Sequence, residues 1–124
     1  MLDASALMAV INGESGGEKL TPEIMSLAVT STVNFAEVHG KLIQRGFPPD
    51  DAWTATRMTV QQAVDFTAEQ AKIAGDLVAQ TRSLGLSLGD RACVALGILL
   101  RAPIYTADKA WKKLNVGVRI HVIR

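Results

Sequence analysis

Four acidic side chains occur where the chain passes between predicted strands and helices. They are Asp3, Glu37, Asp90 and Asp108. Asp3 lies at the end of a predicted strand and Asp108 just past the end of another. Glu37 lies in the first turns of a helix that follows a strand, and Asp90 opens a helix that leads into one. In an open sheet of parallel strands, ligands bind beyond the carboxyl ends of the strands. We therefore predict that the four carboxylates meet at one edge of such a sheet.

Carboxylates that share one edge repel one another, and burial without a cation raises the pKa of some of them. Oxygen ligands without clustered Cys or His favour Mg²⁺ or Mn²⁺. Such ions activate water and stabilise charge on a phosphoryl group, as phosphodiester cleavage requires. The residue types thus suit a metal-dependent phosphodiesterase.

Each of these acids also has a purely structural interpretation. Asp90 follows Ser87 at the spacing of a helix capping box, and Asp3 and Asp108 precede helices that they would cap. Glu37 shares a helical stripe with Asn34 and Lys41 and would then belong to a solvated face. Spacing alone leaves both interpretations open.

Elements of alternating type must position these residues. Short apolar runs predict strands over 1–4, 24–30, 62–66, 103–106 and 119–123. Helical spacing and turn residues predict helices over 5–12, 33–45, from 49 onward, 67–82, 87–101 and 108–114. Strands that alternate with helices indicate an α/β fold with a parallel sheet covered on both faces. The 124 residues correspond to a single domain over 1–124.

Composition excludes several classes of protein. A single cysteine forms no internal disulfide, and no Cys or His cluster has zinc-ligand spacing. The longest apolar stretch, 92–100, is too short to span a bilayer, and Asp3 stands where a signal peptide would be positive. We expect a cytoplasmic protein with no membrane contact.

Charge is sorted along the chain, although 13 Lys and Arg against 12 Asp and Glu leave a net charge of only +1. Residues 1–90 carry six basic and eleven acidic side chains, whereas residues 91–124 carry seven basic side chains and a single acid. The basic segment is either a phosphate-facing surface or an ordinary solvated face. Near-neutrality of the whole chain therefore does not exclude a nucleic-acid substrate. The candidates for phosphate contacts in the basic segment are Arg91, Lys112, Lys113 and Arg119.

Four segments resemble the PIN domain, and more narrowly the VapC-type toxin ribonucleases of toxin–antitoxin modules. They are LDASAL at 2–7, VNFAEV at 33–38, LSLGDRAC at 86–93 and YTADKAW at 105–111. The segments occur in the order and at the intervals of the family. The resemblance implies a three-layer α/β/α fold with about five parallel strands and an acidic pocket that binds Mg²⁺ or Mn²⁺ for RNA hydrolysis.

By position, the resemblance makes Asp3, Glu37, Asp90 and Asp108 the catalytic and metal-binding quartet. It implies that Ser5 and Thr106 orient these carboxylates or metal-bound water. It also implies a homodimer and a cognate antitoxin that docks in a groove near the early helices. The candidates for that groove are Leu42, Trp53 and Met58.

Two other functions compete with a ribonuclease toxin. A PIN-like scaffold that only binds proteins would lack members of the quartet, whereas all four are present. A receiver-type signalling domain would carry a phospho-accepting aspartate on its third strand, where Asp65 lies, but the acidic pair expected after the first strand is missing.

Overall fold

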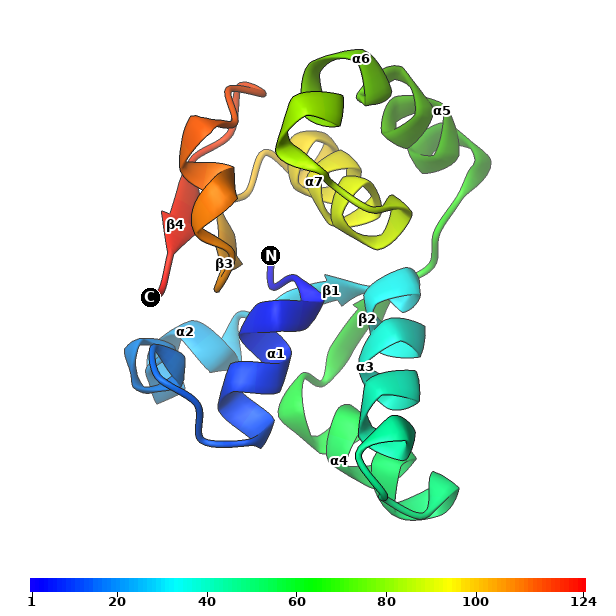
Figure 1. Cartoon of the computed structure of the whole chain (residues 1–124), viewed down its shortest axis with the longest axis vertical. Helices are drawn as coiled ribbons and strands as arrows, with labels where there is room; N and C mark the ends of the chain where they lie inside the picture. The colour runs from blue at the N-terminus through cyan, green and yellow to red at the C-terminus, as the bar shows by residue number, and fades with distance from the viewer.

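The computed structural model describes residues 1–124. It contains short parallel strands between layers of helices (Figure 1). In chain order the elements are α1 (Ala4–Ile11), η1 (Gly17–Lys19), α2 (Pro22–Ser26), β1 (Val29–Ser31), α3 (Thr32–Gln44), α4 (Pro49–Thr59), β2 (Gln62–Val64), α5 (Ala68–Asp76), α6 (Val78–Thr81), η2 (Arg82–Leu84), α7 (Leu88–Leu100), β3 (Ile104–Thr106), η3 (Lys109–Lys113) and β4 (Ile120–Val122), where η marks a 3₁₀ helix.

The first three residues join two pairs of parallel strands. β1 pairs with β2 and β3 pairs with β4. Between the pairs, the N–H of Leu2 donates to the carbonyl of Val29 at 3.0 Å, and the N–H of Tyr105 donates to the carbonyl of Met1 at 2.8 Å. Leu2 also forms a parallel bridge with Tyr105. The order β2, β1, residues 1–3, β3, β4 thus gives five parallel segments, of which the first is an extended segment rather than a regular strand.

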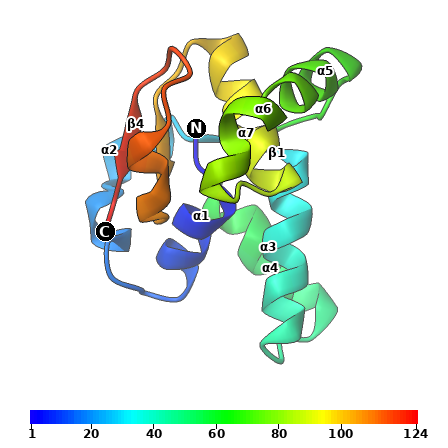
Figure 2. The ribbon, with the colours of Figure 1, turned by 45° about the horizontal axis from the view of Figure 1, so that its top comes forward.

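Side chains alternate between the two faces of this layer. Leu2 and Tyr105 pack in the core formed with α1, α3 and α4, whereas Met1 and Ile104 pack with α7 and the fully buried Trp111 of η3. Successive residues of an extended chain point to opposite faces, which explains the separation into two cores. In Figures 1 and 2, α5, α6 and α7 gather on one side of β1, and α1, α3 and α4 on the other. The three-layer α/β/α prediction is confirmed.

Local signals place the main helices close to their predicted bounds. Ser31 caps α3, and Ser87 forms a capping box with Asp90 at the start of α7. Pro49 and the acids that follow it open α4.

Three predicted elements differ from the structure. The strand predicted over 24–30 begins as α2, because Thr21 caps a helix with proline at its first position, and only Val29–Ser31 is extended. Ala4, predicted at the end of the first strand, already belongs to α1. The helix predicted over 67–82 is divided into α5, α6 and η2.

Candidate functional site

Asp3 lies at the centre of the candidate site and is only 2% exposed. It caps α1 by accepting from the N–H of Ala6 at 2.8 Å. The hydroxyl of Ser5 lies 2.8 Å from both of its carboxylate oxygens, and the hydroxyl of Thr106 donates to it at 2.7 Å. Three donors from two segments therefore hold this carboxylate in one orientation.

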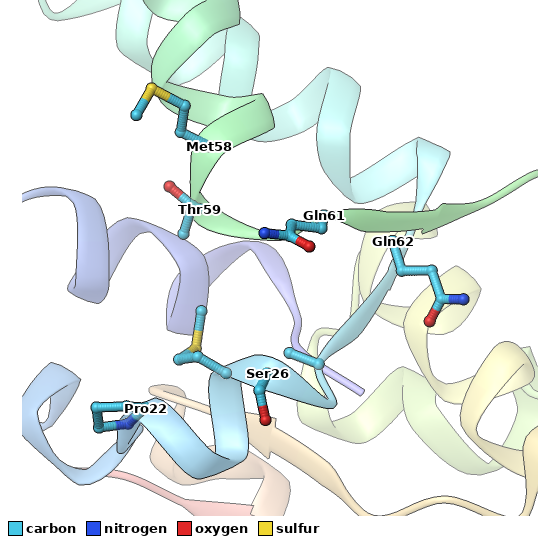
Figure 3. A pocket seen from close by; sticks show the side chains of 8 residues that line it. Pro22, Ser26, Met58, Thr59, Gln61 and Gln62 are labelled. Atoms are coloured by element: carbon cyan, nitrogen blue, oxygen red, sulfur yellow. The ribbon is translucent and has the colours of Figure 1, made fainter.

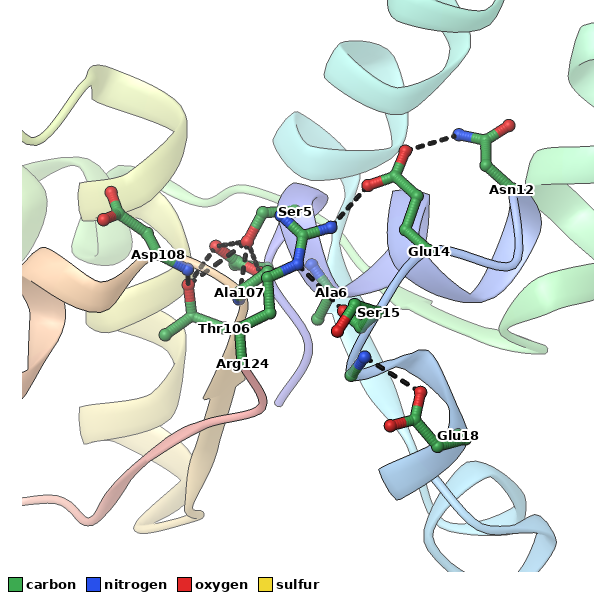
Figure 4. Close-up of polar contacts among 12 residues, drawn as sticks. Ser5, Ala6, Asn12, Glu14, Ser15, Glu18, Thr106, Ala107, Asp108 and Arg124 are labelled. Atoms are coloured by element: carbon green, nitrogen blue, oxygen red, sulfur yellow. Dashed lines mark hydrogen bonds and ion pairs between the residues drawn. The ribbon is translucent and has the colours of Figure 1, made fainter.

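The two hydroxyls also connect Asp3 to the end of β3. Ser5 Oγ accepts from the N–H of Ala107 at 2.8 Å, and Thr106 Oγ1 accepts from the N–H of Asp108 at 3.0 Å (Figure 4). Each hydroxyl thus receives a backbone hydrogen bond and directs its own proton toward Asp3. The network positions the start of the Asp108 turn relative to the first segment.

Burial raises the pKa of Asp3 from 3.8 to about 6. Its hydrogen bonds to Ala6, Thr106 and Ser5 favour the charged form and limit this rise, and the nearby charge of Asp90 adds to it. The carboxylate of Asp3 is therefore desolvated and lies close enough to a second acid to feel its charge.

Asp90 faces the same edge from the start of α7. Its carboxylate accepts from the N–H of Ser87 at 2.9 Å, and its own N–H donates to Ser87 Oγ at 3.2 Å. Burial raises its pKa, and the charges of Glu37 and Asp108 raise it further. The capping interpretation of Asp90 is therefore correct, and the same side chain lies within the field of the other acids.

Glu37 approaches α7 from α3 and is held by neighbouring side chains. Lys41 Nζ lies 3.1 Å from Glu37 Oε1, one helical turn along. Asn34 Nδ2 donates to the carbonyl of Gly89 at 3.0 Å and to Glu37 Oε2 at 3.4 Å. A Cβ atom at position 89 would lie 2.6 Å from that oxygen, so glycine leaves room for the Glu37 carboxylate in this position.

Asn34 is the residue of this site whose role the sequence did not reveal. It is fully buried, and its Oδ1 has no hydrogen-bond partner. Its position on the helical stripe of Glu37 was visible in the sequence, but the contact with Gly89 depends on how α3 packs against α7.

Asp108 differs from the other three acids in being exposed. It caps η3 by accepting from the N–H of Ala110 at 2.9 Å. Its capping role is thus also correct, and its free surface faces solvent at the same edge.

In this conformation no three His, Cys, Asp or Glu side chains converge on a point that could hold a metal ion. The donor set still fits a hard divalent cation, since it consists of carboxylate oxygens and two members have pKa values raised by burial and like charge.

The four predicted phosphate contacts separate into different regions. Lys112 and Lys113 are exposed on η3, directly after Asp108. Arg91 instead donates to the carbonyl of Ala74 at 2.9 Å and ties α7 to α5. Arg119 precedes β4 and therefore lies at the edge of the sheet opposite the acids, away from Lys112 and Lys113. Arg82, not singled out from the sequence, is exposed on η2, which packs against η3.

The three predicted groove residues do not form one surface. Leu42 is fully buried in the core beneath α3, which contradicts its assignment to a surface groove. Trp53 is 46% exposed and packs edge-on against Phe35 and His39, with ring centroids 6.0 and 5.5 Å away. Met58 is 78% exposed and lines a cavity of about 670 Å³ between α2 and the link from α4 to β2 (Figure 3).

No helix has the length and hydropathy required to cross a bilayer.

Comparison with known proteins yields one family and several structures. The family model of the PIN domain matches residues 1–117. A search of curated proteins finds no match. Among solved structures, VapBC2 from Rickettsia felis bound to a DNA fragment from its promoter has a TM-score of 0.72 at 17% identity and covers 97% of this chain and 95% of its own.

Two further structures share the fold. A toxin–antitoxin complex from Klebsiella pneumoniae has a TM-score of 0.64 at 18% identity, with 94% of this chain and 92% of that chain covered. VapBC-5 from Mycobacterium tuberculosis, of the VapBC family of toxin–antitoxin systems, has a TM-score of 0.61 at 18% identity, with 99% and 95% covered. The same arrangement of elements is thus compatible with very different sequences.

Proposed function

The chain belongs to the PIN domain family, and on that premise we propose that it is a metal-dependent endoribonuclease that serves as the toxin of a toxin–antitoxin module. The observation that carries this proposal is the placement of Asp3, Glu37, Asp90 and Asp108 at one edge of the sheet, around a carboxylate whose pKa is raised to about 6. Mg²⁺ or Mn²⁺, bound by these four side chains, would supply an activated water and stabilise charge on the phosphoryl oxygens.

Residues around the quartet have supporting roles in this proposal. Ser5 and Thr106 keep Asp3 in a fixed orientation and direct both of their protons toward it. Lys112 and Lys113, with Arg82 on the adjacent 3₁₀ helix, would contact RNA phosphates beside Asp108. Such contacts position the backbone of the substrate without selecting its sequence.

The direct test is RNA cleavage by the purified chain with and without added Mg²⁺ or Mn²⁺. We expect cleavage only with the metal, and its loss in Asp90→Asn. The matched control is Asp65→Asn, which changes an exposed aspartate after β2 and should leave cleavage intact. Cleavage that persists in excess chelator would refute the mechanism. Binding of a partner with no cleavage under any metal would favour the scaffold function.

We propose that the antitoxin docks over the cavity that Met58 lines, between α2 and α4. Met58 is 78% exposed at the border of this cavity, where Met25 and Ala28 add apolar surface. Co-expression with the product of the adjacent upstream gene should give a complex that Met58→Glu weakens and Trp53→Ala retains. Retention of the complex by Met58→Glu would place the antitoxin elsewhere. We further propose that the chain works in the cytoplasm as a homodimer, which sedimentation would test.

A further inference from the structure

A second cavity lies at the edge of the sheet opposite the acidic quartet. It has a volume of about 570 Å³ and is bordered by the carboxyl end of α7 and the segment that leads into β4, which lie side by side in Figure 2. Ile98, Val116 and Val118 contribute apolar surface, and Arg101 and Arg119 are exposed at its border. This volume lies within the range of pockets that bind small ligands or a few side chains of a partner.

Neither arginine of this cavity has an internal partner. The four ion pairs of the molecule involve other residues, and neither guanidinium donates a hydrogen bond. No acidic residue lines the cavity. Two unpaired guanidiniums beside an apolar surface form a site complementary to an anionic group attached to an apolar one.

Arg101 occupies a backbone conformation that favours glycine. It is the only residue other than glycine with positive φ, at φ 50° and ψ 42°, and it terminates α7. Glycine is the usual residue at this left-handed position because it has no Cβ to clash. Favourable interaction with the helix dipole does not require this position, since a cation anywhere in the last turn provides it. The local fold therefore does not account for an arginine here.

The lining of the cavity distinguishes between two kinds of anionic polymer. Single-stranded RNA is recognised largely by stacking of bases on aromatic side chains. The cavity has no aromatic residue, and its apolar lining is aliphatic or proline. Aliphatic side chains flanked by carboxylates match this surface better than nucleotides do.

We infer that the cavity between α7 and β4 binds an acidic peptide segment of a protein partner, with its carboxylates on Arg101 and Arg119 and its aliphatic side chains on Ile98, Val116 and Val118. This inference does not depend on the proposed nuclease activity, because the cavity and the acidic quartet lie at opposite edges of the sheet.

The test uses a fluorescent peptide with the core Glu-Leu-Val-Glu and its Gln-Leu-Val-Gln counterpart, titrated with the whole chain. We expect binding of the acidic peptide alone. Arg101→Gly and Arg119→Ala should each raise its Kd about five- to tenfold, in keeping with the loss of an Arg–carboxylate pair. Arg82→Ala, which removes an exposed arginine elsewhere, is the matched control and should leave the Kd unchanged.

Arg101→Gly separates binding from folding. Because glycine relieves the left-handed strain, this variant should unfold at a higher temperature than the parent while binding the peptide more weakly. Equal binding of the acidic and neutral peptides, an unchanged Kd in both arginine variants, or displacement of the peptide by a short RNA at lower concentration would each overturn the inference.

Discussion

The two edges of the sheet carry opposite charges and differ in how the local fold explains them. At the carboxyl edge, Asp3, Asp90 and Asp108 each cap a helix, so local structure alone would retain them. At the amino edge, Arg101 and Arg119 have no partner, and the conformation of Arg101 is unfavourable for its residue type. A residue whose type is explained by the local structure is weak evidence for function. A residue whose type is unfavourable for its local conformation calls for an explanation outside the local structure. The acids gain functional meaning only because they lie at one edge of the sheet, close enough for the charge of one to raise the pKa of another.

The largest expected effect comes from Asp3→Asn. Asparagine can still cap α1, but it removes a charge from the quartet, and we expect cleavage to fall by about a hundredfold or more, the size of losses on removing one stabilising group from an active site. Cleavage rates with Mg²⁺ at saturation measure this. If Asp3→Asn cleaved RNA as fast as the parent, the acids at the carboxyl edge would be helix caps without a catalytic role.

The same variant should stabilise the metal-free protein at neutral pH. The pKa of Asp3 is about 6 in the folded protein, compared with a reference value of 3.8. Because ionisation of Asp3 is less favourable in the folded protein than in the unfolded chain, the free energy of unfolding decreases as the pH rises from about 4 to about 6. Asp3→Asn lacks this cost and should be more stable by about 1–3 kcal/mol above pH 6, with little difference near pH 3. Urea unfolding with chelator present, across this pH range, measures the difference. A parent whose stability increases from pH 4 to pH 6 relative to the variant would contradict the burial argument.

Thr106→Val tests whether the hydroxyl network serves the site beyond stability. The change conserves shape but removes the donor to Asp3 and the acceptor for the N–H of Asp108. We expect activity or metal affinity to fall about ten- to a hundredfold, with a stability loss of about 1–3 kcal/mol. Titration with Mn²⁺ measures the change in metal affinity, and thermal unfolding measures the change in stability. Thr106→Ser, which keeps the hydroxyl, should recover most of the activity, and failure to do so would indicate that packing dominates.

Lys112→Ala with Lys113→Ala should weaken RNA binding while sparing the chemical step. Because phosphate contacts release counterions, the double variant should show a shallower dependence of affinity on salt, with log–log slope smaller by about 1–2. Titration of RNA with Asp90→Asn protein prevents cleavage during the measurement. Arg119→Ala is the matched control at the other edge, and an equal change there would remove the distinction between the two edges.

The smallest effect is expected at Glu14, whose carboxylate forms ion pairs with two arginines. Arg124 contacts this carboxylate (Figure 4), as does Arg45, and the hydrogen bond from Arg45 is the main cause of its lowered pKa. A lowered pKa stabilises the fold above the ordinary value near 4.5, and this contribution is lost as pH falls. Glu14→Gln should destabilise by about 0.5 kcal/mol at neutral pH, because the pair is partly exposed. If Glu14→Gln lowered the free energy of unfolding more at low pH than at neutral pH, this account of the ion pairs would be contradicted.

Much of the fold follows from local signals in the sequence. Capping residues and apolar spacing locate α3, α4 and α7 within a few residues. α2 was missed because the apolar run after Thr21 and Pro22 was read as a strand, although these two residues form a helix start. The division of α5 from α6 at Leu77 follows Gly75, in the last turn of α5, a helix-weakening residue that the prediction of one continuous helix passed over.

The candidate site was predictable to a different degree. The acids were found through motifs, but the distances that relate them depend on packing between α3 and α7. Leu42 could have been assigned to the core, since it shares a helical stripe with Phe35 and Val38. The hydrogen bond of Arg91 to Ala74 depends on tertiary contacts that no local pattern specifies.

The central position of residues 1–3 has a consequence for synthesis. This segment lies between β1 and β3, so one of its neighbours leaves the ribosome about a hundred residues after it. Until then Asp3 lacks the hydroxyl of Thr106, and Asp108 has not yet been made. Domains fold as units once their segments are available, and pairing between distant segments is slow. A nascent chain would therefore remain without an assembled acidic edge until β3 and Asp108 have left the ribosome.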